Sequence, residues 1–420
     1  MKMARFNNLK MFDIKMVISN KVHTDFLIIG AGMAGASLAA KLSLSAKVVV
    51  LEMEASPGYH TTGRSAAVFA PLYGPRPVRA LTRASRNFFL DEENIVDGQP
   101  LVKARDVLMI ANKEQDKKLT SFYEDLKDDS RVSLLNEIET QKTQPLLKSD
   151  YAIGSVLDSS GFDIDVGLMH QLYLKRAKLN GCTIFPSESA KYFFEDKSGW
   201  RIHTEKREIV CSVVVNAAGA WANEIGKLAG AEDIGLVPKR RTALLVDPPY
   251  KRDIAQLPIT IDIEELFYLK PEAASLLISP ADETPSDPCD VQPEEIDVAI
   301  CVDRIEAAFA LKIELIRSKW AGLRSFVSDK SPVADFSGKV ESFFWLAGQG
   351  GYGIQTAPAL ADFSCSLLLG KPVSEDLLLQ GVLSNDLSIK RLTKKIDKSL
   401  STTTSSINLN FDFSNPNINE

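Results

Sequence analysis

The sequence predicts an α/β protein in which a discontinuous Rossmann-like domain is interrupted by an inserted domain of mixed-sheet α+β type. Two observations support this fold class. Glycine-rich segments follow short apolar runs near the start, the middle and the end of the chain, and strand-rich stretches lie between them. The 420 residues also exceed one ordinary domain, so two buried cores are expected.

The first glycine-rich segment has the pattern of a dinucleotide-binding loop. An apolar run over residues 26–29 predicts a buried strand, and Gly30-Ala31-Gly32-Met33-Ala34-Gly35 then leads into a helix. We expect Gly30 to permit the tight turn, Gly32 to let the backbone approach a pyrophosphate, and Gly35 to let the helix pack closely on the strand. The free N–H groups at the start of the helix favour phosphate binding.

Glu52 follows the second apolar run, residues 48–51, at the spacing expected for a ribose-binding acid. Its carboxylate can accept hydrogen bonds from both hydroxyls of an adenosine ribose, and it repels a 2′-phosphate. Strand, glycine loop, helix, strand and acid therefore occur in the order that predicts a dinucleotide cofactor without that phosphate.

Composition narrows the classes of function. Hydrophobic residues make up 45% of the chain and charged residues 25%, which is typical of a soluble globular protein. The net charge of −6 gives no electrostatic reason to bind nucleic acid. The five cysteines are widely spaced and the four histidines show no ligand spacing, so we expect reduced thiols, no metal and a cytoplasmic location.

The two ends of the chain are interpreted as extensions. Residues 1–22 are basic but lack the apolar core of a secretory signal, so they form an N-terminal extension or an over-long start. No apolar run approaches the length of about 20 residues that a transmembrane helix needs. Residues 386–420 form a C-terminal tail, and its Ser-, Thr- and Asn-rich end is expected to be disordered.

Local patterns predict the elements between these ends. Residues 57–67 are small and polar and predict a loop that approaches a ligand, and Pro77 opens an amphipathic helix. Residues 101–147 are charged and less periodic, as expected for an excursion from the first domain. Asp165 is placed to cap a helix.

The later elements continue this alternation of strands and helices. A hairpin turn is expected at residues 196–199. The remaining predictions are a helix end at Asn180-Gly181, a strand over 182–185, one buried strand over 209–215 that enters Asn216-Ala217-Ala218-Gly219-Ala220-Trp221, strands and turns over 237–278, a helix over 290–312, a strand over 343–347, the loop Gly348-Gln349-Gly350-Gly351-Tyr352-Gly353 and a final helix through Leu368.

Three of these segments together resemble the D-amino-acid oxidase-like family of FAD-dependent amine oxidoreductases: residues 26–52, 213–221 and 345–356. Within that family the chain is most similar to bacterial D-arginine dehydrogenase-type enzymes. The runs that carry this second resemblance are residues 57–67, 238–241, 267–271 and 320–326, and the likeness extends over residues 23–385.

The resemblance implies an FAD-binding domain made of residues 23–100, 150–235 and 325–385, and a substrate-binding domain made of residues 101–149 and 236–324. It also implies FAD held without a covalent link, because no cysteine or histidine matches the family's attachment positions, although His60 stands nearest. The implied cofactor-binding residues are Gly30, Gly32, Ala34, Gly35, Glu52, Thr62, Arg64, Ser65, Ala66, Ala67, Ala217, Gly219, Gly350, Tyr352, Gly353 and Ile354.

Five positions match substrate-site residues of the family. Arg324 matches the arginine that binds the substrate carboxylate, and a guanidinium can hold a carboxylate through two hydrogen bonds. Tyr268 is expected to donate its hydroxyl to the same carboxylate, and Arg241 matches a more peripheral arginine. The carbonyl of Gly351 is expected to accept from the substrate amine. Tyr73 matches a tyrosine on a mobile loop that covers the site.

Two positions depart from the D-arginine-type pattern. Val107 stands where that subgroup has an acid for the substrate guanidinium, and Val68 replaces a histidine of the active-site loop. Asp106 is adjacent but should point away if residues 107–109 form a strand. Valines favour apolar contacts, so an uncharged amino acid, as the D-isomer, is the expected substrate.

The expected activity is FAD-dependent oxidative deamination. Hydride passes from Cα to the flavin N5, and water converts the imino acid into a 2-oxo acid and ammonia. Oxidation of a secondary amine such as an N-methyl amino acid, or of a 2-hydroxy acid, is left open, as is the electron acceptor, oxygen or a quinone-type carrier. A flavoprotein without activity, or an NAD dehydrogenase, fits less well.

Overall fold

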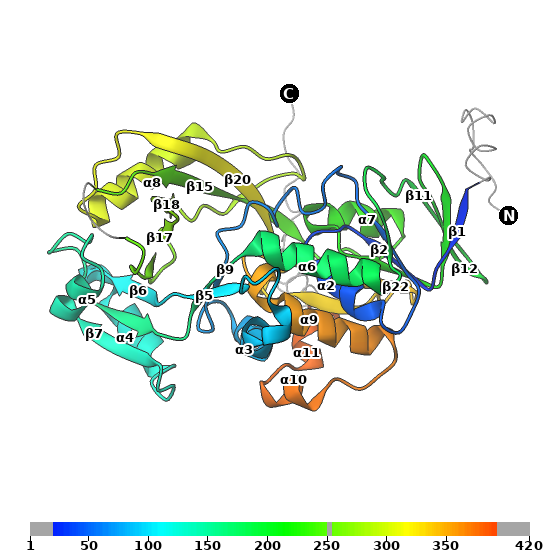
Figure 1. The fold of residues 1–420 in the computed structure, drawn as a ribbon, viewed down its shortest axis with the longest axis horizontal. Coiled ribbons are helices and arrows are strands. Elements are labelled where there is room, and N and C mark those ends of the chain that lie inside the picture. Colours follow the sequence, from blue (N-terminus) through cyan, green and yellow to red (C-terminus); the bar gives the residue numbers. More distant parts are fainter. Residues whose placement is uncertain (1–19, 250–253, 393–420) are drawn as a thin grey trace, which may run out of the picture.

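The computed structural model describes residues 20–249 and 254–392. The part of the molecule on the right in Figure 1 contains a six-stranded sheet with the order β10-β3-β2-β14-β22-β21. Neighbours in this sheet are parallel except for β21, which pairs antiparallel with β22. Its strands are β2 (Phe26–Ile29), β3 (Val48–Leu51), β10 (Thr183–Phe185), β14 (Val213–Asn216), β21 (Val333–Phe336) and β22 (Phe343–Ala347).

Helices and a second sheet cover the two faces of the six-stranded sheet, which explains why its central strands are apolar throughout. Helix α2 packs against α6 and α9, and α3 packs against α9. Asp165 caps α6 by accepting a 2.8 Å hydrogen bond from the N–H of Leu168, as predicted. The helices of this part are α2 (Met33–Leu42), α3 (Arg76–Leu90), α6 (Val166–Leu179), α7 (Ala222–Leu228), α9 (Gly353–Leu368), α10 (Glu375–Leu379) and α11 (Ser384–Leu387), with short 3-10 turns η1 (Glu92–Asn94) and η3 (Gly219–Trp221).

The strand predicted over residues 209–215 is wrong as a single element. The structure divides it into β13 (Glu208–Cys211) and β14, which belong to different sheets. The N–H groups of Ser212 and Val213 both bond to the carbonyl of Asp25, and this break in the ladder lets the chain pass from one sheet to the other. The four-stranded sheet has the order β1-β13-β12-β11, with β1 (Lys21–His23), β12 (Gly199–His203) and β11 (Tyr192–Asp196), and the β11–β12 hairpin confirms that prediction.

The part on the left in Figure 1 contains a nine-stranded mixed sheet. Its order is β19-β15-β18-β17-β16-β6-β8-β7, and β20 pairs with the free side of β15. Strands β16 and β6 pair in parallel, and the other pairs are antiparallel. The strands are β6 (Val107–Ala111), β7 (Val132–Asn136), β8 (Gly154–Asp158), β15 (Val237–Val246), β16 (Ile259–Asp262), β17 (Tyr268–Glu272), β18 (Ser275–Ser279), β19 (Thr284–Pro285) and β20 (Ile316–Phe326).

The structure differs from the sequence-based expectation at two domain boundaries and at the end of one helix. Strand β8 belongs to it, although residues 150–235 are assigned to the cofactor domain from the sequence, and β20 continues across the boundary placed at residue 325. The helix predicted over 290–312 is shorter, because Phe309 is already extended. The helices here are α4 (Asp116–Glu124), α5 (Glu137–Thr143) and α8 (Glu295–Ala308), with the 3-10 turn η2 (Lys113–Gln115).

A three-stranded sheet lies between the two large sheets in the view of Figure 1. It consists of β4 (Val68–Phe69), β9 (Phe162–Ile164) and β5 (Val102–Ala104). At the N-terminus, β1 begins inside the stretch interpreted as an extension, and residues 1–19 lie outside the described residues. The end of the tail, residues 393–420, lies outside them as well. None of the described helices is both long and apolar enough to cross a membrane.

Candidate active site

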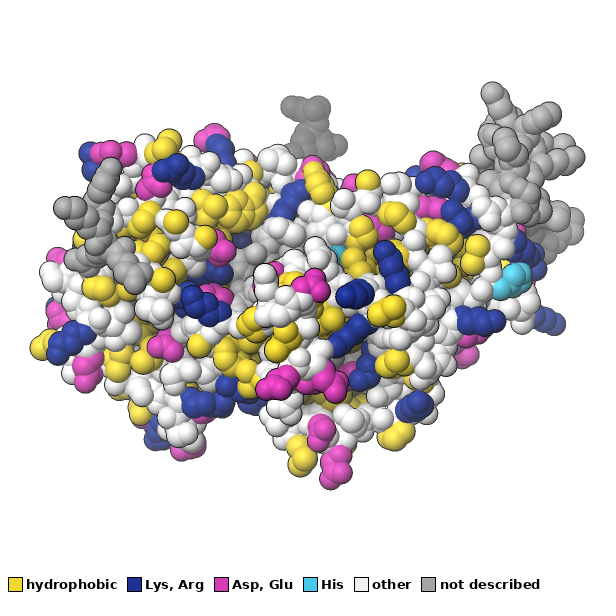
Figure 2. All heavy atoms as spheres, viewed as in Figure 1, with side chains coloured by type: hydrophobic (Ala, Val, Ile, Leu, Met, Phe, Trp, Pro, Cys, Tyr) yellow, Lys and Arg dark blue, Asp and Glu magenta, His cyan; other side chains and the backbone are white. Residues whose placement is uncertain are grey.

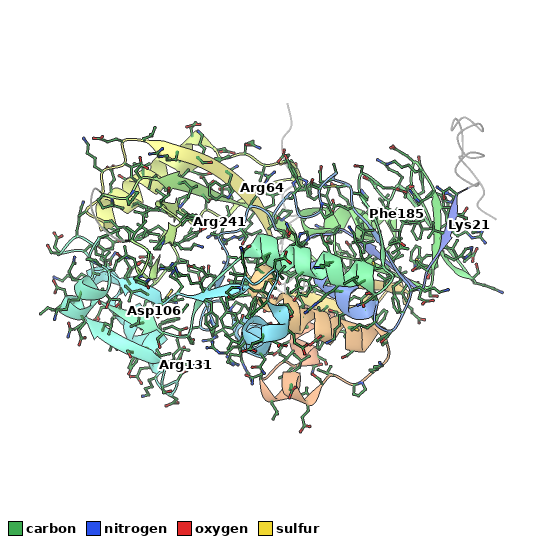
Figure 3. The ribbon with its side chains drawn as sticks, in the orientation of Figure 1. Lys21, Arg64, Asp106, Arg131, Phe185 and Arg241 are labelled. Carbon is green, nitrogen blue, oxygen red and sulfur yellow. The ribbon has the colours of Figure 1, made fainter. Side chains whose placement is uncertain are left out.

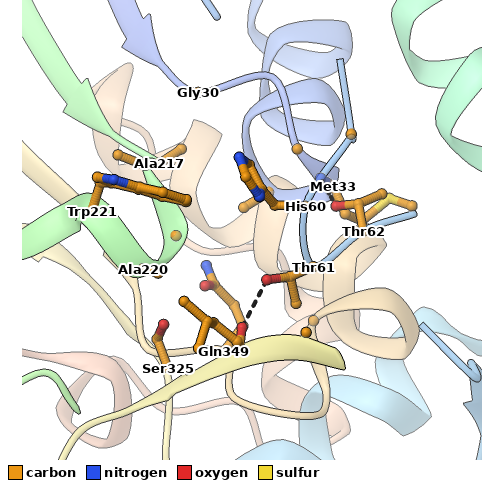
Figure 4. A pocket seen from close by; sticks show the side chains of 18 of the residues that line it. Gly30, Met33, His60, Thr61, Thr62, Ala217, Ala220, Trp221, Ser325 and Gln349 are labelled. Atoms are coloured by element: carbon orange, nitrogen blue, oxygen red, sulfur yellow. Dashed lines mark hydrogen bonds between the residues drawn. The ribbon is translucent and has the colours of Figure 1, made fainter. Parts of the chain in front are cut away.

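Three loops that are far apart in the sequence meet at one edge of the six-stranded sheet. They follow β2, β14 and β22, which are adjacent and parallel, so their carboxyl ends lie side by side. A cavity of about 380 Å³ opens there and is lined by residues of all three loops (Figure 4). In open α/β sheets this edge is where ligands bind.

The first loop and Glu52 form one end of this cavity. Glu52 is 7% exposed, and its two carboxylate oxygens accept hydrogen bonds from the N–H groups of Ala31, at 2.8 Å, and Glu54, at 2.9 Å. Gly35 lies behind the cavity, where a Cβ would stand 1.9 Å from the Gly30 carbonyl oxygen. The close packing of α2 on β2 therefore requires a glycine, as predicted.

His170 is a support of this loop that the sequence did not indicate. From α6 its Nε2 lies 2.8 Å from the carbonyl oxygen of Ala31, so the ring donates a hydrogen bond to the loop. Burial lowers the pKa of His170, while the hydrogen bond to Ala31 raises it by a smaller amount. A lone histidine inside an amphipathic helix has no local signal of this contact.

Residues 58–66 join the first loop to the nine-stranded sheet. The hydroxyl of Thr62 accepts a 2.9 Å hydrogen bond from the N–H of Met33, and Thr61 donates at 2.7 Å to the carbonyl of Leu323 (Figure 4). Arg64 lines the cavity, but its guanidinium is committed to protein partners. It donates to the carbonyls of Val291 and Ala321, at 3.0 Å each, and pairs with Asp290.

His60 also lines the cavity. Its Nε2 lies 2.9 Å from a carboxylate oxygen of Glu54, and its ring centroid lies 4.6 Å from that of Trp221. Both rings face the cavity near Gly30 and Ala217 (Figure 4). The ring therefore has a carboxylate and an aromatic partner within the protein.

The third loop leads into the N-terminus of α9. Gly350, Gly353 and Ile354 line the cavity, and no side chain caps the first turn of the helix. A helix start of this kind is electropositive and stabilises negative charge beside it. Tyr352 instead packs its ring against Tyr73, at 5.2 Å between centroids, and is absent from the cavity lining.

Buried polar atoms without partners face the same cavity. Within the described residues, Ser325 Oγ, Gln349 Nε2 and Arg241 Nη1 are buried and lack a hydrogen-bond partner. Such atoms cost free energy unless a ligand or water satisfies them. Ser325 Oγ and Gln349 Nε2, together with the glycine loop and Glu52, fit a long polar cofactor such as a dinucleotide.

The predicted substrate residues converge where this cavity meets a second, smaller one of about 60 Å³. Arg241 on β15, Tyr268 on β17 and Arg324 on β20 line both cavities. Arg241 lies near the middle of the molecule (Figure 3). Gly351 lines both cavities too, and a Cβ there would stand 2.8 Å from Arg324 Nη1. A side chain at this position would therefore displace the Arg324 guanidinium.

The two guanidinium groups are poorly compensated. Within residues 20–249 and 254–392, Arg324 has no hydrogen-bond or ion-pair partner, while Arg241 donates at 2.9 Å to the Asp282 carbonyl and lies 3.5 Å from a carboxylate oxygen of Glu283. Burial, followed by the charge of Arg324, lowers the pKa of Arg241. Guanidinium groups stay protonated in proteins even so, and the cavity therefore attracts an anion.

Tyr73 stays protonated in this site. Burial and then the carboxylate of Glu265 raise the pKa of Tyr73 well above its ordinary value. Burial by itself lowers the pKa of Arg324. The surrounding Tyr268, Tyr73, Tyr352 and Glu265 have the larger combined effect and raise the pKa of Arg324 above its ordinary value. Tyr73 therefore acts as a donor, and its hydroxyl gives a 2.9 Å hydrogen bond to Glu265.

The second cavity has mainly apolar walls, including Val68, Ala70, Ile259 and Ile261. Val107 is absent from both linings, and its side chain packs against Gly161 instead. The expected place of Val107 in the pocket is therefore wrong, because strand β6 turns that residue into the core.

The structure shows which acidic side chain lines the second cavity. Asp106 and Glu264 are exposed and line neither cavity, and Asp106 lies on the side of the nine-stranded sheet (Figure 3). Glu265, which the sequence did not single out, is the acid that lines the second cavity. Ala67 lines this cavity and not the first, whereas Ser65 and Ala66 line both.

The described part of the chain has neither a metal-binding group nor a disulfide. It contains no group of three or more His, Cys, Asp or Glu residues that could hold a metal ion, and its five cysteines are unpaired. Burial raises the pKa of the Cys182 and Cys211 thiols to about 12, which makes them unreactive. On the face shown in Figure 2, basic and acidic side chains are interspersed.

The cavity at three converging loops of a parallel sheet, with a glycine-rich turn and a buried acid in its lining, defines the class of dinucleotide-binding proteins. Comparison with known proteins agrees and is more specific. The model of the family described as FAD dependent oxidoreductase matches residues 25–367, so the chain belongs to that family and uses FAD.

Two curated relatives and one solved structure illustrate the likeness. The chain is 24% identical to glycine oxidase from Bacillus subtilis over 369 residues, covering 85% of this chain and 96% of that protein. It is also 24% identical to glycerol 3-phosphate dehydrogenase from Caloramator mitchellensis over 361 residues, covering 82% and 73%. The crystal structure of L-proline dehydrogenase from P. horikoshii has the same fold, with a TM-score of 0.74, 19% identity and coverage of 89% and 99%.

Proposed function

We propose that this protein oxidises an amino acid to an imino acid, which water hydrolyses to a 2-oxo acid and ammonia. The observation that carries the proposal is Arg324, which lines both cavities and has no hydrogen-bond or ion-pair partner among residues 20–249 and 254–392. A carboxylate is the natural partner, because it accepts two parallel hydrogen bonds from a guanidinium. Bound FAD supplies the acceptor for the hydride that leaves Cα.

The side chains around Arg324 orient the substrate in this proposal. Tyr268 donates its hydroxyl to the same carboxylate, and Arg241 adds a more peripheral contact. The carbonyl of Gly351 accepts from the amine, and Tyr73 covers the bound substrate. All four residues line the second cavity with Arg324. Fixing the two polar ends of the amino acid directs its Cα hydrogen toward the flavin, so positioning provides the catalysis once the amine has lost its proton.

The proposed substrate is a D-amino acid with an uncharged side chain. The second cavity of about 60 Å³ supports this, because it is small and Val68, Ile259 and Ile261 form part of its wall. We further propose that FAD is held without a covalent link, since His60 is already bound to Glu54. The five unpaired cysteines support a reducing, cytoplasmic environment.

Two related reactions are the alternatives, each favoured by one comparison. The structural neighbour is an L-proline dehydrogenase, and L-proline is a secondary amine. An N-methyl amino acid, which is also a secondary amine, is therefore one candidate substrate. Glycerol 3-phosphate is an alcohol, so a 2-hydroxy acid is the other. Both substrates carry an anion that Arg324 could bind, and the nitrogen or oxygen on the reacting carbon is what separates them.

Anaerobic reduction of the purified, yellow protein tests the proposal. D- and L-amino acids, N-methyl amino acids and 2-hydroxy acids are added in turn, and loss of flavin absorbance is followed. We expect D-amino acids with small apolar side chains to reduce the flavin fastest. Reduction by the hydroxy acids alone would overturn the proposal, and repeating the active cases in air or with a quinone identifies the acceptor.

A further inference from the structure

Glu265 is the one carboxylate among the described residues that line the second cavity. It lies between β16 and β17, in a turn that buried Asp262 holds together. Asp262 accepts hydrogen bonds from the N–H groups of Glu264, at 2.9 Å, and Leu266, at 3.2 Å. The Glu265 carboxylate is therefore attached to a well-fixed turn and not to a free loop.

The backbone of Glu265 is unusual for a glutamate. Its φ angle is +60°, in the left-handed region that glycine and asparagine favour. A residue held in that region costs free energy, which is accepted when the side chain has a task. Here the conformation aims the carboxylate at Tyr73, whose hydroxyl donates to it at 2.9 Å.

The charges around the cavity explain what this carboxylate does. Arg241 and Arg324 contribute two positive charges, and Glu265 contributes one negative charge. The α-carboxylate of a bound substrate is proposed to pair with Arg324. A second carboxylate, on the substrate side chain, adds an anion beside Glu265 in a cavity of only about 60 Å³. Glu283, 3.5 Å from Arg241 Nη2, already provides further negative charge nearby.

We infer that Glu265 is a specificity-determining residue that excludes amino acids with acidic side chains from the second cavity. This inference rests on the proposed function, because it takes the second cavity as the place of the substrate side chain. Glu265 would discriminate by repelling a negatively charged side chain. A neutral amide of the same shape is not repelled. At short range in a partly buried site, one such repulsion changes relative rates by about tenfold or more.

Isosteric pairs of substrates isolate this effect. D-asparagine is compared with D-aspartate and D-glutamine with D-glutamate, using kcat/KM for flavin reduction. We expect the wild-type protein to prefer the amide by about tenfold or more, and Glu265→Gln to reduce that ratio by about tenfold. Because a ratio is measured, a general loss of activity or of folded protein does not imitate the result.

Three further variants complete the test. Glu264→Gln removes the adjacent, exposed acid and should leave the ratio as in the wild type. Glu265→Asp keeps a carboxylate in a residue that tolerates positive φ, so it should retain the preference for the amide. Tyr73→Phe removes the hydrogen bond but keeps the charge, and it should retain the preference as well.

The outcomes separate the two proposals. If amino acids reduce the flavin but the ratio is the same in wild type and Glu265→Gln, the inference is wrong and the proposed function stands. Loss of the preference in Glu264→Gln or Tyr73→Phe would also overturn it, because then the Glu265 charge is not the cause. If no amino acid reduces the flavin, the proposed function fails and the inference with it.

Discussion

Both carboxylate oxygens of Glu52 accept hydrogen bonds from backbone N–H groups of the protein itself. These contacts to Ala31 and Glu54 hold the carboxylate at the wall of the first cavity. For the ribose contact proposed for Glu52 this orientation is favourable, because the side chain does not have to be ordered on binding.

Glu52→Ala is therefore expected to weaken FAD binding by roughly 1–3 kcal/mol, because acceptors for the ribose hydroxyls are lost. The dissociation constant of FAD for the apoprotein, measured by calorimetry, checks this. Thermal unfolding of the same apoprotein shows how much of the effect comes from the lost contacts to Ala31 and Glu54. An unchanged FAD affinity would mean that the carboxylate does not face the cofactor.

Arg324→Met should lower kcat/KM by about 3 kcal/mol in free-energy terms, because the substrate carboxylate loses its charged partner. FAD content should be retained. Arg317→Met is a matched control, since Arg317 is exposed on the same strand and pairs with Asp247. Normal turnover by Arg324→Met with bound FAD would remove this residue from the site.

The side-chain preference gives a third expectation. D-arginine should be a poor substrate next to D-leucine or D-methionine, because its long side chain would have to enter a cavity of about 60 Å³ whose walls include Val68 and Ile261. The Glu265 carboxylate in the same cavity already accepts a hydrogen bond from Tyr73 and is expected to offset only part of the lost hydration. Steady-state kcat/KM values for the three substrates decide this. Faster turnover of D-arginine than of the neutral amino acids would show that Glu265 attracts cations.

Val107 behaves differently from what its position in the sequence suggests. Because it is 4% exposed and packs against Gly161, Val107→Glu places a charge in the core. That change is expected to destabilise the fold and not to create a guanidinium site.

At the scale of elements, helix α6 supports the loop after β2 through His170. The 2.8 Å hydrogen bond to Ala31 requires a donor, and burial keeps the imidazole neutral by lowering its pKa. Strands β2, β14 and β22 set the loops side by side, and α6 then fixes the first of them from behind. The sheet and the helix thus share the task of shaping the cavity.

His170 predicts a specific dependence of stability on pH. Its pKa in the folded protein lies below the ordinary 6.5, so the unfolded chain binds the proton more readily. Its contribution is fully present above that value and is lost as the pH falls below it toward the folded pKa. Unfolding free energies between about pH 7.5 and 5.5 should therefore fall more steeply for the wild type than for His170→Gln. Equal slopes would contradict this.

At the scale of the whole molecule, the cavities lie between the two large sheets. The six-stranded sheet contributes the loops after β2, β14 and β22, and the nine-stranded sheet contributes Arg241, Tyr268 and Arg324. The loop of residues 58–66 connects the parts, since Arg64 bonds to carbonyls of Val291 and Ala321. A ligand in the first cavity, of about 380 Å³, would therefore contact both halves of the fold.

Removal of FAD should lower the thermal stability of the entire protein. A ligand present at about 100 times its dissociation constant stabilises the folded state by about 2.7 kcal/mol. Scanning calorimetry of holoprotein and apoprotein measures the difference. We expect both parts to shift together, because both line the cavity. A second transition that does not respond to FAD would show that the nine-stranded part unfolds independently.

Dinucleotide binding at this edge of the sheet can be predicted from local spacing in the chain, whereas FAD in particular was implied by the resemblance of three segments to a known family. Gly30, Gly35 and Glu52 lie within one short strand–helix–strand unit, where chain geometry leaves few arrangements. Tyr268 and Arg324 were also assigned from their surrounding motifs, and the structure brings them to the same pair of cavities.

The lining of the side-chain cavity depended on tertiary structure. Whether Val107 faces the cavity or the core is set by how β6 packs on its neighbours, and Glu265 reaches the cavity through a left-handed turn that has no local signature. The division of residues 209–215 between two sheets likewise depends on the distant carbonyl of Asp25. Contacts between segments far apart in the chain decide such features, and short-range patterns do not contain them.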